Sequence, residues 1–195
     1  EALGIENVLA LRGDRPSGFS GSDAELFATF PHAEHLVSYI RAHHPQLAIG
    51  VAGFPEAHAE APSFADDLEV MRRKVECGAD FVITQLYFDN RTYFDYVERL
   101  RARGVNVPIV PGILPIRNMG SLRFILEMCN ARIPGRLING LLKANEEGGA
   151  KAVYEIGVAY ARAQVKELLD GGAPGVHLYT LNKADMCLQV MEGQI

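Results

Sequence analysis

Polar side chains that could bind or react with a ligand lie within or after three apolar runs of the sequence. Asp14 comes just after the first run, His58 lies in the loop after the second, and Gln85 lies within the third. A carboxylate in such a place could stabilise positive charge that develops on a substrate. An imidazole could bind phosphate or sugar groups, and the Gln85 amide offers a donor beside an acceptor, which suits the edge of a planar heterocycle.

Each of these features also has an interpretation without function. The Gly-Asp pair that Asp14 completes is common in turns, and the loop Gly53–Ala61 and the helical pair Arg73-Lys74 could be solvated surface. Arg and Lys could equally bind a diphosphate, Arg with its planar fork and Lys as a point charge. For Gln85 the balance favours a ligand, because an amide buried in an apolar strand without hydrogen bonds costs on the order of 1–3 kcal/mol.

Hydrophobic periodicity locates the strands and helices that must position these residues. The predicted strands are Asn7–Leu11, Leu47–Ala52, Phe81–Leu86, Val107–Val110 and Val176–Tyr179. The predicted helices are His32–His43, Ser63–Cys77, Asn90–Arg103, Ser121–Asn130 and Ala150–Leu169, with a last helix after Asn182. Buried strands that alternate with helices predict a parallel sheet, either open and doubly wound or closed as a (β/α) barrel.

Two observations favour the barrel. No G-x-G-x-x-G sequence opens a helix, which weakens the dinucleotide-binding alternative. Polar residues instead follow several different strands, as they do at the mouth of a barrel. We therefore expect the five strands to be parallel and adjacent in chain order, with Asp14, Gln85 and Thr180 at the same end of the sheet.

Composition excludes several classes of partner. The 195 residues fit one domain, and 48% of them are hydrophobic, enough for a real core. A net charge of -5 without a Lys/Arg cluster argues against nucleic acid, and no apolar run is long enough to span a membrane. The three cysteines are far apart, which fits neither a disulfide framework nor a metal site and predicts a cytoplasmic location.

Seven segments, in family order, resemble the methylenetetrahydrofolate reductase family. They are Leu9–Asp14, Val51–Ala61, Arg72–Ala79, Ile83–Asp89, Pro111–Pro115, Arg132–Pro134 and Tyr179–Lys183. The resemblance implies an α/β fold, a (β/α)8 TIM barrel that binds FAD, of which this chain supplies about the last five β/α units. It implies that NADH or NADPH reduces the flavin, which then reduces 5,10-methylenetetrahydrofolate to 5-methyltetrahydrofolate. We further expect a homo-oligomer.

The resemblance also implies roles for particular residues. Asp14 is the expected catalytic residue, because a carboxylate near the 5-iminium cation of the opened folate ring would stabilise it. The expected FAD-binding residues are Arg12, Gly13, Asp14, Phe54, His58, Ala61, Asp67, Arg73 and Lys74. The expected folate-binding residues are Asp14, Gln85, Ser121 and Lys183. Lys183 stands where an Arg is common in the family and lacks its bidentate fork.

We interpret residues 1–195 as a single domain, a partial barrel without its N-terminal strands. The family's general acid, a Glu on the first strand, has no counterpart here, and the chain begins with Glu1 rather than Met. We therefore expect the chain alone not to reduce folate. Two alternatives stay open: a non-catalytic module that binds flavin or a partner protein, and a barrel enzyme that uses a folate or phosphate ligand without flavin.

Overall fold

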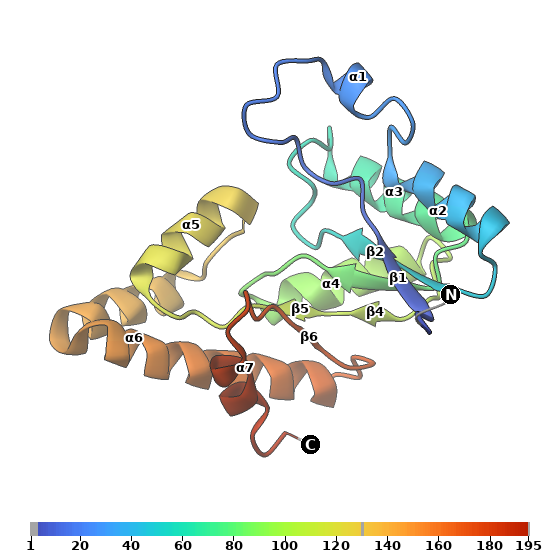
Figure 1. Ribbon diagram of the computed structural model, residues 1–195. Coiled ribbons are helices and arrows are strands. Elements are labelled where there is room, and N and C mark those ends of the chain that lie inside the picture. Colours follow the sequence, from blue (N-terminus) through green and yellow to red (C-terminus); the bar gives the residue numbers. More distant parts are fainter. Residues whose placement is uncertain (1–3, 130, 195) are drawn as a thin grey trace.

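The strands of the computed structural model, which describes residues 4–129 and 131–194, are all parallel where they pair. One sheet has the order β1-β2-β3-β4, and β5 pairs with β6 (Figure 1). The strands are β1 (Asn7–Ala10), β2 (Ala48–Gly53), β3 (Phe81–Thr84), β4 (Ile109–Val110), β5 (Gly112–Ile113) and β6 (His177–Leu178). Only Pro111 separates β4 from β5, so these two short strands continue one another.

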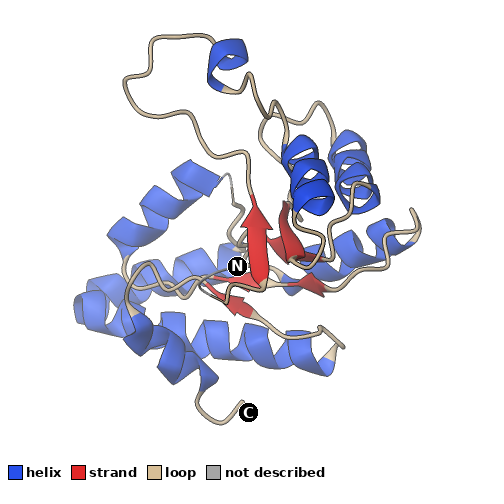
Figure 2. Cartoon of the chain, turned by 45° about the vertical axis from the view of Figure 1, so that its right-hand side comes forward, coloured by secondary structure: helices blue, strands red, loops and turns tan. Residues whose placement is uncertain are grey.

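Helices follow the strands and pack around them (Figure 2). They are α1 (Asp23–Leu26), α2 (Ala33–His43), α3 (Phe64–Glu76), α4 (Asn90–Arg101), α5 (Met119–Cys129), α6 (Gly135–Asp170) and α7 (Ala184–Met191). Local capping explains where two of them begin. The Ser63 hydroxyl accepts the Asp66 N–H at the start of α3, and the Asp89 carboxylate accepts the Arg91 N–H at the start of α4. Within the described residues no helix is both long and apolar enough to cross a membrane.

The two faces of the sheet differ in burial. Side chains on one face, such as Ile49, Val51 and Val82, are fully buried in a core shared with α3, α4 and the second half of α6. On β1 the alternate residue Leu9 is 45% exposed, and Leu11 just beyond the strand is 48% exposed. Because strand side chains alternate between faces, one face is covered by helices and the other is partly open.

The expected elements agree with the structure in most places. All five predicted strand positions are strands, parallel and in chain order, and the fourth continues past Pro111 as β5. The described strands form no closed barrel, because β1 pairs only with β2 and the strand order does not return to it. This open arrangement is consistent with the expected partial barrel. The predicted end of one helix at Asn130 lies outside the described residues.

Two helical segments were missed. The short helix α1 lies in the long connection after β1, and α6 begins at Gly135 rather than at Ala150. Gly149, with φ 63° and ψ -154°, breaks α6 into two helices, and the second matches the predicted one. The first half contains several glycines, which lower intrinsic helix propensity and hid it from the sequence pattern.

A close approach between β3 and β5 joins the two sheets. The Gly112 N–H donates to the Thr84 hydroxyl oxygen at 2.9 Å, and the Thr84 side chain is completely buried. A Cβ atom on residue 112 would lie 2.1 Å from the Thr84 carbonyl oxygen. Backbone cannot yield there as a flexible side chain could, so only glycine fits this crossing.

Gly112→Ala is therefore expected to destabilise the protein. The added methyl group overpacks against backbone, which typically costs about 1–3 kcal/mol. The matched control is Gly140→Ala in α6, where a Cβ would meet nothing within 4 Å and should stabilise by up to about 1 kcal/mol. Urea unfolding of both variants measures the difference, and equal stability of the two would contradict the steric account.

Candidate functional site

The expected site residues follow the carboxyl ends of neighbouring strands. Asp14 follows β1, His58 follows β2, Gln85 follows β3 and Thr180 follows β6. Because the strands are parallel and β4 continues into β5, these ends lie at the same end of the sheet. The predicted arrangement of Asp14, Gln85 and Thr180 is confirmed.

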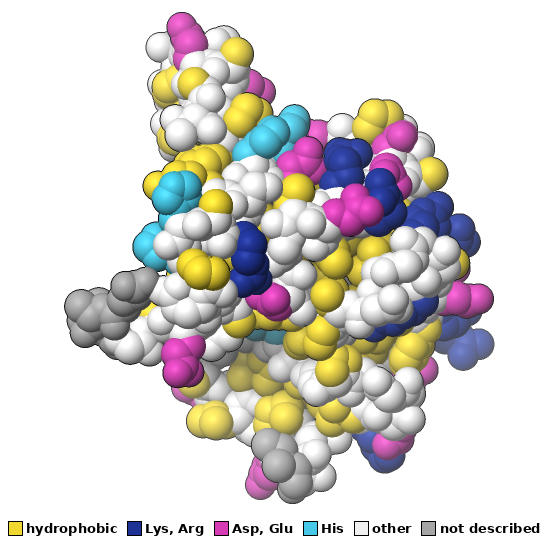
Figure 3. Space-filling view, turned by 90° about the vertical axis from the view of Figure 1, so that its right-hand side faces the viewer, with side chains coloured by type: hydrophobic (Ala, Val, Ile, Leu, Met, Phe, Trp, Pro, Cys, Tyr) yellow, Lys and Arg dark blue, Asp and Glu magenta, His cyan; other side chains and the backbone are white. Residues whose placement is uncertain are grey.

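Contacts between charged and aromatic side chains tie the loop after β1 to the loop after β2. The Arg12 guanidinium lies 3.0 Å from the Glu60 carboxylate and 4.7 Å from the centre of the Phe27 ring. The Glu60 N–H donates to Nδ1 of His58. The His58 and Phe54 rings are arranged in a T shape, with their centres 4.6 Å apart. Figure 3 shows histidine, basic and acidic side chains together on the upper part of one face of the molecule. Arg12, Phe54 and His58 thus form one continuous surface.

Two buried charged side chains support this surface from below. Asp67 is 6% exposed and Lys74 8% exposed, and the Lys74 ammonium donates to the Ala52 carbonyl oxygen at 3.0 Å. Burial raises the pKa of Asp67, although the Lys74 charge and a backbone hydrogen bond from His58 oppose the shift. Burial also lowers the pKa of Lys74, and the negative charge of Asp67 opposes this shift. These contacts fix the start of the loop that carries His58.

Arg73 and Lys74, which the sequence offered as a pair, make different contacts in the structure. The Arg73 guanidinium pairs with Glu34 of α2 at 3.1 Å, whereas Lys74 points inward to the Ala52 carbonyl. Neighbours on a helix point in different directions, about 100° apart, so one packs against α2 and the other beneath the sheet edge. Ala61 is half-buried at the end of the same loop.

Asp14 is exposed, and it follows Gly13 in the long connection after β1. This connection is held by contacts among its own residues. Arg15 pairs with Asp23 at 2.8 Å and donates to the Gly21 carbonyl oxygen at 2.6 Å. Asp14 itself has no hydrogen bond or ion pair to the described residues. Its negative charge adds to burial in raising the pKa of the Cys129 thiol, so Asp14 lies near the carboxyl end of α5.

Gln85 differs from its prediction in one respect. We expected an amide inside a buried strand, but β3 ends at Thr84 and Gln85 is only half-buried. Its side-chain oxygen accepts the Leu86 N–H at 2.9 Å, and its side-chain nitrogen has no partner in the described part of the chain. The fully buried polar residue is Thr84, which the sequence reasoning missed because a threonine fits an apolar strand. The Gln85 amide nitrogen therefore remains available to a ligand.

Ser121 and Lys183 line a common pocket of about 190 Å³ next to Tyr179. The Ser121 hydroxyl donates to the Asn118 carbonyl oxygen at 2.9 Å, and the Asn118 side chain accepts the Ser121 N–H at 2.8 Å. Asn118 thus caps the start of α5, Ser121 lies in the first turn of the helix and lines the pocket, and Lys183 is exposed at the pocket's rim. The structure brings together these two expected folate-binding residues, from α5 and from the start of α7.

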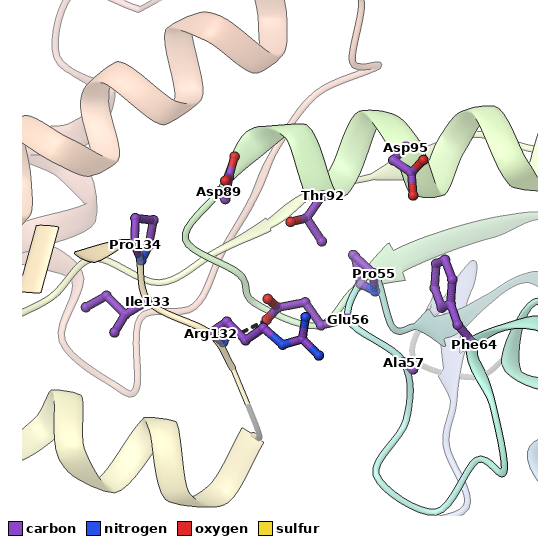
Figure 4. Close-up of a pocket in the computed structure, with 10 residues that line it drawn as sticks. All are labelled: Pro55, Glu56, Ala57, Phe64, Asp89, Thr92, Asp95, Arg132, Ile133 and Pro134. Carbon is purple, nitrogen blue, oxygen red and sulfur yellow. Dashed lines mark hydrogen bonds between the residues drawn. The ribbon is translucent and has the colours of Figure 1, made fainter. Parts of the chain in front are cut away.

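A larger pocket of about 620 Å³ lies between α3, α4 and the segment before α6 (Figure 4). No expected site residue lines it. At its floor the Glu56 carboxylate accepts the Arg132 N–H at 3.0 Å, which ties the loop after β2 to a segment 76 positions later. Burial raises the pKa of Glu56, with the Arg132 hydrogen bond opposing. Both residues belong to segments that matched the family, but their contact could not be found from sequence spacing.

Glu56→Gln is expected to flatten the dependence of stability on pH. A carboxyl pKa raised above its usual 4.5 means that the folded state holds the proton more tightly than the unfolded state. That stabilisation is fully present below the unfolded pKa and is lost as pH rises through the folded pKa. The amide keeps an oxygen for the Arg132 N–H and does not ionise, so the variant should lose less stability than wild type across this interval.

Urea unfolding at a series of pH values on both sides of 4.5 tests this expectation. The control is Glu127→Gln, which neutralises an exposed carboxylate on α5. If the Glu56 and Glu127 variants show the same pH profile, the contribution assigned to Glu56 is wrong.

Comparison with known proteins identifies the family of the chain. A family model described as methylenetetrahydrofolate reductase matches residues 1–194. The chain belongs to this family. The 5,10-methylenetetrahydrofolate reductase of Escherichia coli is 37% identical over 186 residues, which cover 94% of this chain and 58% of the relative. The NADH-linked reductase 1 of Arabidopsis thaliana is 38% identical over 191 residues, which cover 92% of this chain and 31% of the relative.

The chain therefore spans only part of these relatives, from about a third to little more than half of their length. A solved structure of similar fold is an uncharacterized protein from Clostridium thermocellum that binds two copies of 5-methyl-5,6,7,8-tetrahydrofolic acid. Its TM-score is 0.56 with 18% identity, covering 82% of this chain and 56% of that chain. This likeness supports the α/β fold with a parallel sheet, consistent with part of a barrel.

Proposed function

We propose that the protein containing this chain reduces 5,10-methylenetetrahydrofolate to 5-methyltetrahydrofolate, with FAD as cofactor and NADH or NADPH as electron donor. The observation that carries the proposal is the gathering of Arg12, Asp14, His58 and Gln85 at one end of a parallel sheet in a chain of this family. Relatives with names that specify NADH or NADPH support the nicotinamide. The chain would act as part of a longer protein.

The residues present fit a flavin cofactor. Phe54 and His58 offer an aromatic surface, Arg12 lies beside it with its side chain 26% exposed, and the side-chain nitrogen of Gln85 is without a partner in the described residues. The residues that would hold FAD are Arg12, Gly13, Asp14, Phe54, His58, Ala61 and Arg73, with Asp67 and Lys74 fixing the loop from below. FAD, when bound, supplies a carrier that takes a hydride from the nicotinamide and delivers it to the folate.

Asp14 would stabilise the cation that forms on the folate. The substrate ring must open to a 5-iminium cation before it accepts a hydride, and a carboxylate beside that cation lowers the free energy of forming it. Asp14 suits the task because its carboxylate is exposed at the strand ends and has no ion-pair partner among the described residues to neutralise it. Gln85 would bind the pterin edge through its amide nitrogen, and Ser121 and Lys183 would contact the rest of the folate from their shared pocket.

The open face of the sheet supports a role within a larger domain. Leu9 and Leu11 expose apolar surface on the face that the helices leave open, and burying such surface is worth about 25 cal/mol per Å². We propose that the rest of the parent protein supplies strands that cover this face and close the barrel. We also propose that the parent is a cytoplasmic homo-oligomer.

The test is the absorbance spectrum of the purified full-length protein. The expected result is a flavin spectrum that NADH or NADPH bleaches without oxygen and that 5,10-methylenetetrahydrofolate then restores. A colourless protein that cannot be loaded with FAD would contradict the proposal and leave the non-catalytic module or the flavin-free barrel enzyme. Residues 1–195 alone should give no turnover.

Asp14→Asn should slow folate reduction by about 10²-fold, the usual effect of removing one electrostatic stabiliser of a transition state. Reduction of the flavin by the nicotinamide should change much less, because that step forms no folate cation. Stopped-flow measurement of the two half-reactions separates the effects. Asp23→Asn, in the same connection but paired with Arg15, is the control and should leave both steps near wild type. Equal slowing of both steps by Asp14→Asn would contradict the role.

A further inference from the structure

The peptide that joins Thr84 to Gln85 is hydrogen-bonded on both sides. The Gln85 N–H donates to the Gly53 carbonyl oxygen of β2 at 2.7 Å. The Thr84 carbonyl oxygen accepts the phenolic hydroxyl of Tyr179, just after β6, at 2.9 Å. A peptide plane held from both sides cannot rotate freely, so these two bonds set the direction in which the Gln85 side chain leaves the backbone.

The Tyr179 hydroxyl is held firmly in its place. The Tyr179 N–H donates to the Ile113 carbonyl oxygen at 2.9 Å. The His177 and Tyr179 rings are arranged in a T shape, with their centres 4.6 Å apart. A Cβ on residue 112 would lie 2.8 Å from the ring, so Gly112 leaves the space that the ring occupies. Burial raises the pKa of Tyr179 to about 12, and the hydroxyl therefore keeps its proton and donates at neutral pH.

The same ring also lines the pocket of Ser121 and Lys183. Tyr179 thus touches both groups of residues assigned to the folate: the backbone of Gln85 through its hydroxyl, and the second pocket through its ring. Among the described side chains that line this pocket, only Tyr179 has a hydrogen bond to the Thr84–Gln85 peptide.

We propose that Tyr179 is a positioning residue for folate binding, which aims the Gln85 amide by holding the peptide before it. The inference rests on the proposed function and goes beyond it by naming a residue that acts through another. Removing the hydroxyl frees the Thr84 carbonyl oxygen, and the Gln85 amide then samples directions that do not meet the folate.

The experiment is a calorimetric titration of the full-length protein with 5-methyltetrahydrofolate, for wild type and Tyr179→Phe. We expect binding to weaken about three- to tenfold, the size expected for one ordinary hydrogen bond, with the melting temperature little changed. The control is Tyr160→Phe, which removes a hydroxyl that donates to the Phe88 carbonyl oxygen further along the same segment. The control should bind folate as wild type does, and equal losses in both variants would show a general structural effect and overturn the inference.

A double-mutant cycle with Gln85→Ala separates the inference from the function beneath it. If Tyr179 acts through Gln85, Tyr179→Phe weakens binding in wild type but causes no further loss in Gln85→Ala. Additive losses would overturn the inference and leave the proposed function intact. Wild type that binds no folate would instead overturn the proposed function, and a Gln85→Ala variant with unchanged affinity would remove both the Gln85 assignment and the role of Tyr179.

Discussion

The hydrogen bond from the Gly112 N–H to the Thr84 hydroxyl joins the four-stranded sheet to the pair of strands that follows it. Regular pairing between β3 and β4 stops at Ile83 and Val110, and a side-chain hydroxyl takes over at the next position. The close approach places β5, and through it β6, beside β3. The position of the residues after β6 relative to the residues after β3 depends on that crossing. This includes the position of Gln85 relative to the pocket lined by Lys183.

The two halves of the candidate site are held in different ways. The buried side chains of Asp67 and Lys74 lie beneath the surface around His58, and the Lys74 ammonium donates to the Ala52 carbonyl oxygen. Each charge favours the charged form of the other against the cost of burial. The connection that carries Asp14 is held by Arg15 and by exposed ion pairs, which are individually weak. The candidate site therefore combines a surface supported by buried residues with an exposed carboxylate in a connection held by weaker contacts.

The sequence predicts the strands well and the contacts between loops poorly. Apolar runs such as Phe81–Leu86 mark buried strands because burial on both faces leaves little choice of residue. An apolar run does not show where its strand ends, because apolar residues continue beyond the last paired residue. The sequence therefore placed Gln85 inside β3 rather than after it. The bond between Glu56 and Arg132 crosses 76 positions and depends on how α5 returns to the sheet, and no local spacing encodes that. The inward direction of Lys74 could not be predicted for a related reason, since its position on α3 does not reveal that its ammonium turns toward the Ala52 carbonyl oxygen.

The strand order has a consequence for how the molecule assembles. Strands β1 to β4 pair with their neighbours along the chain, so each pairing closes only one βαβ unit. The pairing of β5 with β6 must wait until α5 and the long α6 lie between them, and closing that longer loop costs more chain entropy. The Tyr179 hydroxyl reaches the Thr84 carbonyl oxygen only after this last strand docks. The peptide before Gln85 thus gains this hydrogen bond only with the last strand, and a chain that had formed β1 to β4 alone would have the four-stranded sheet without it.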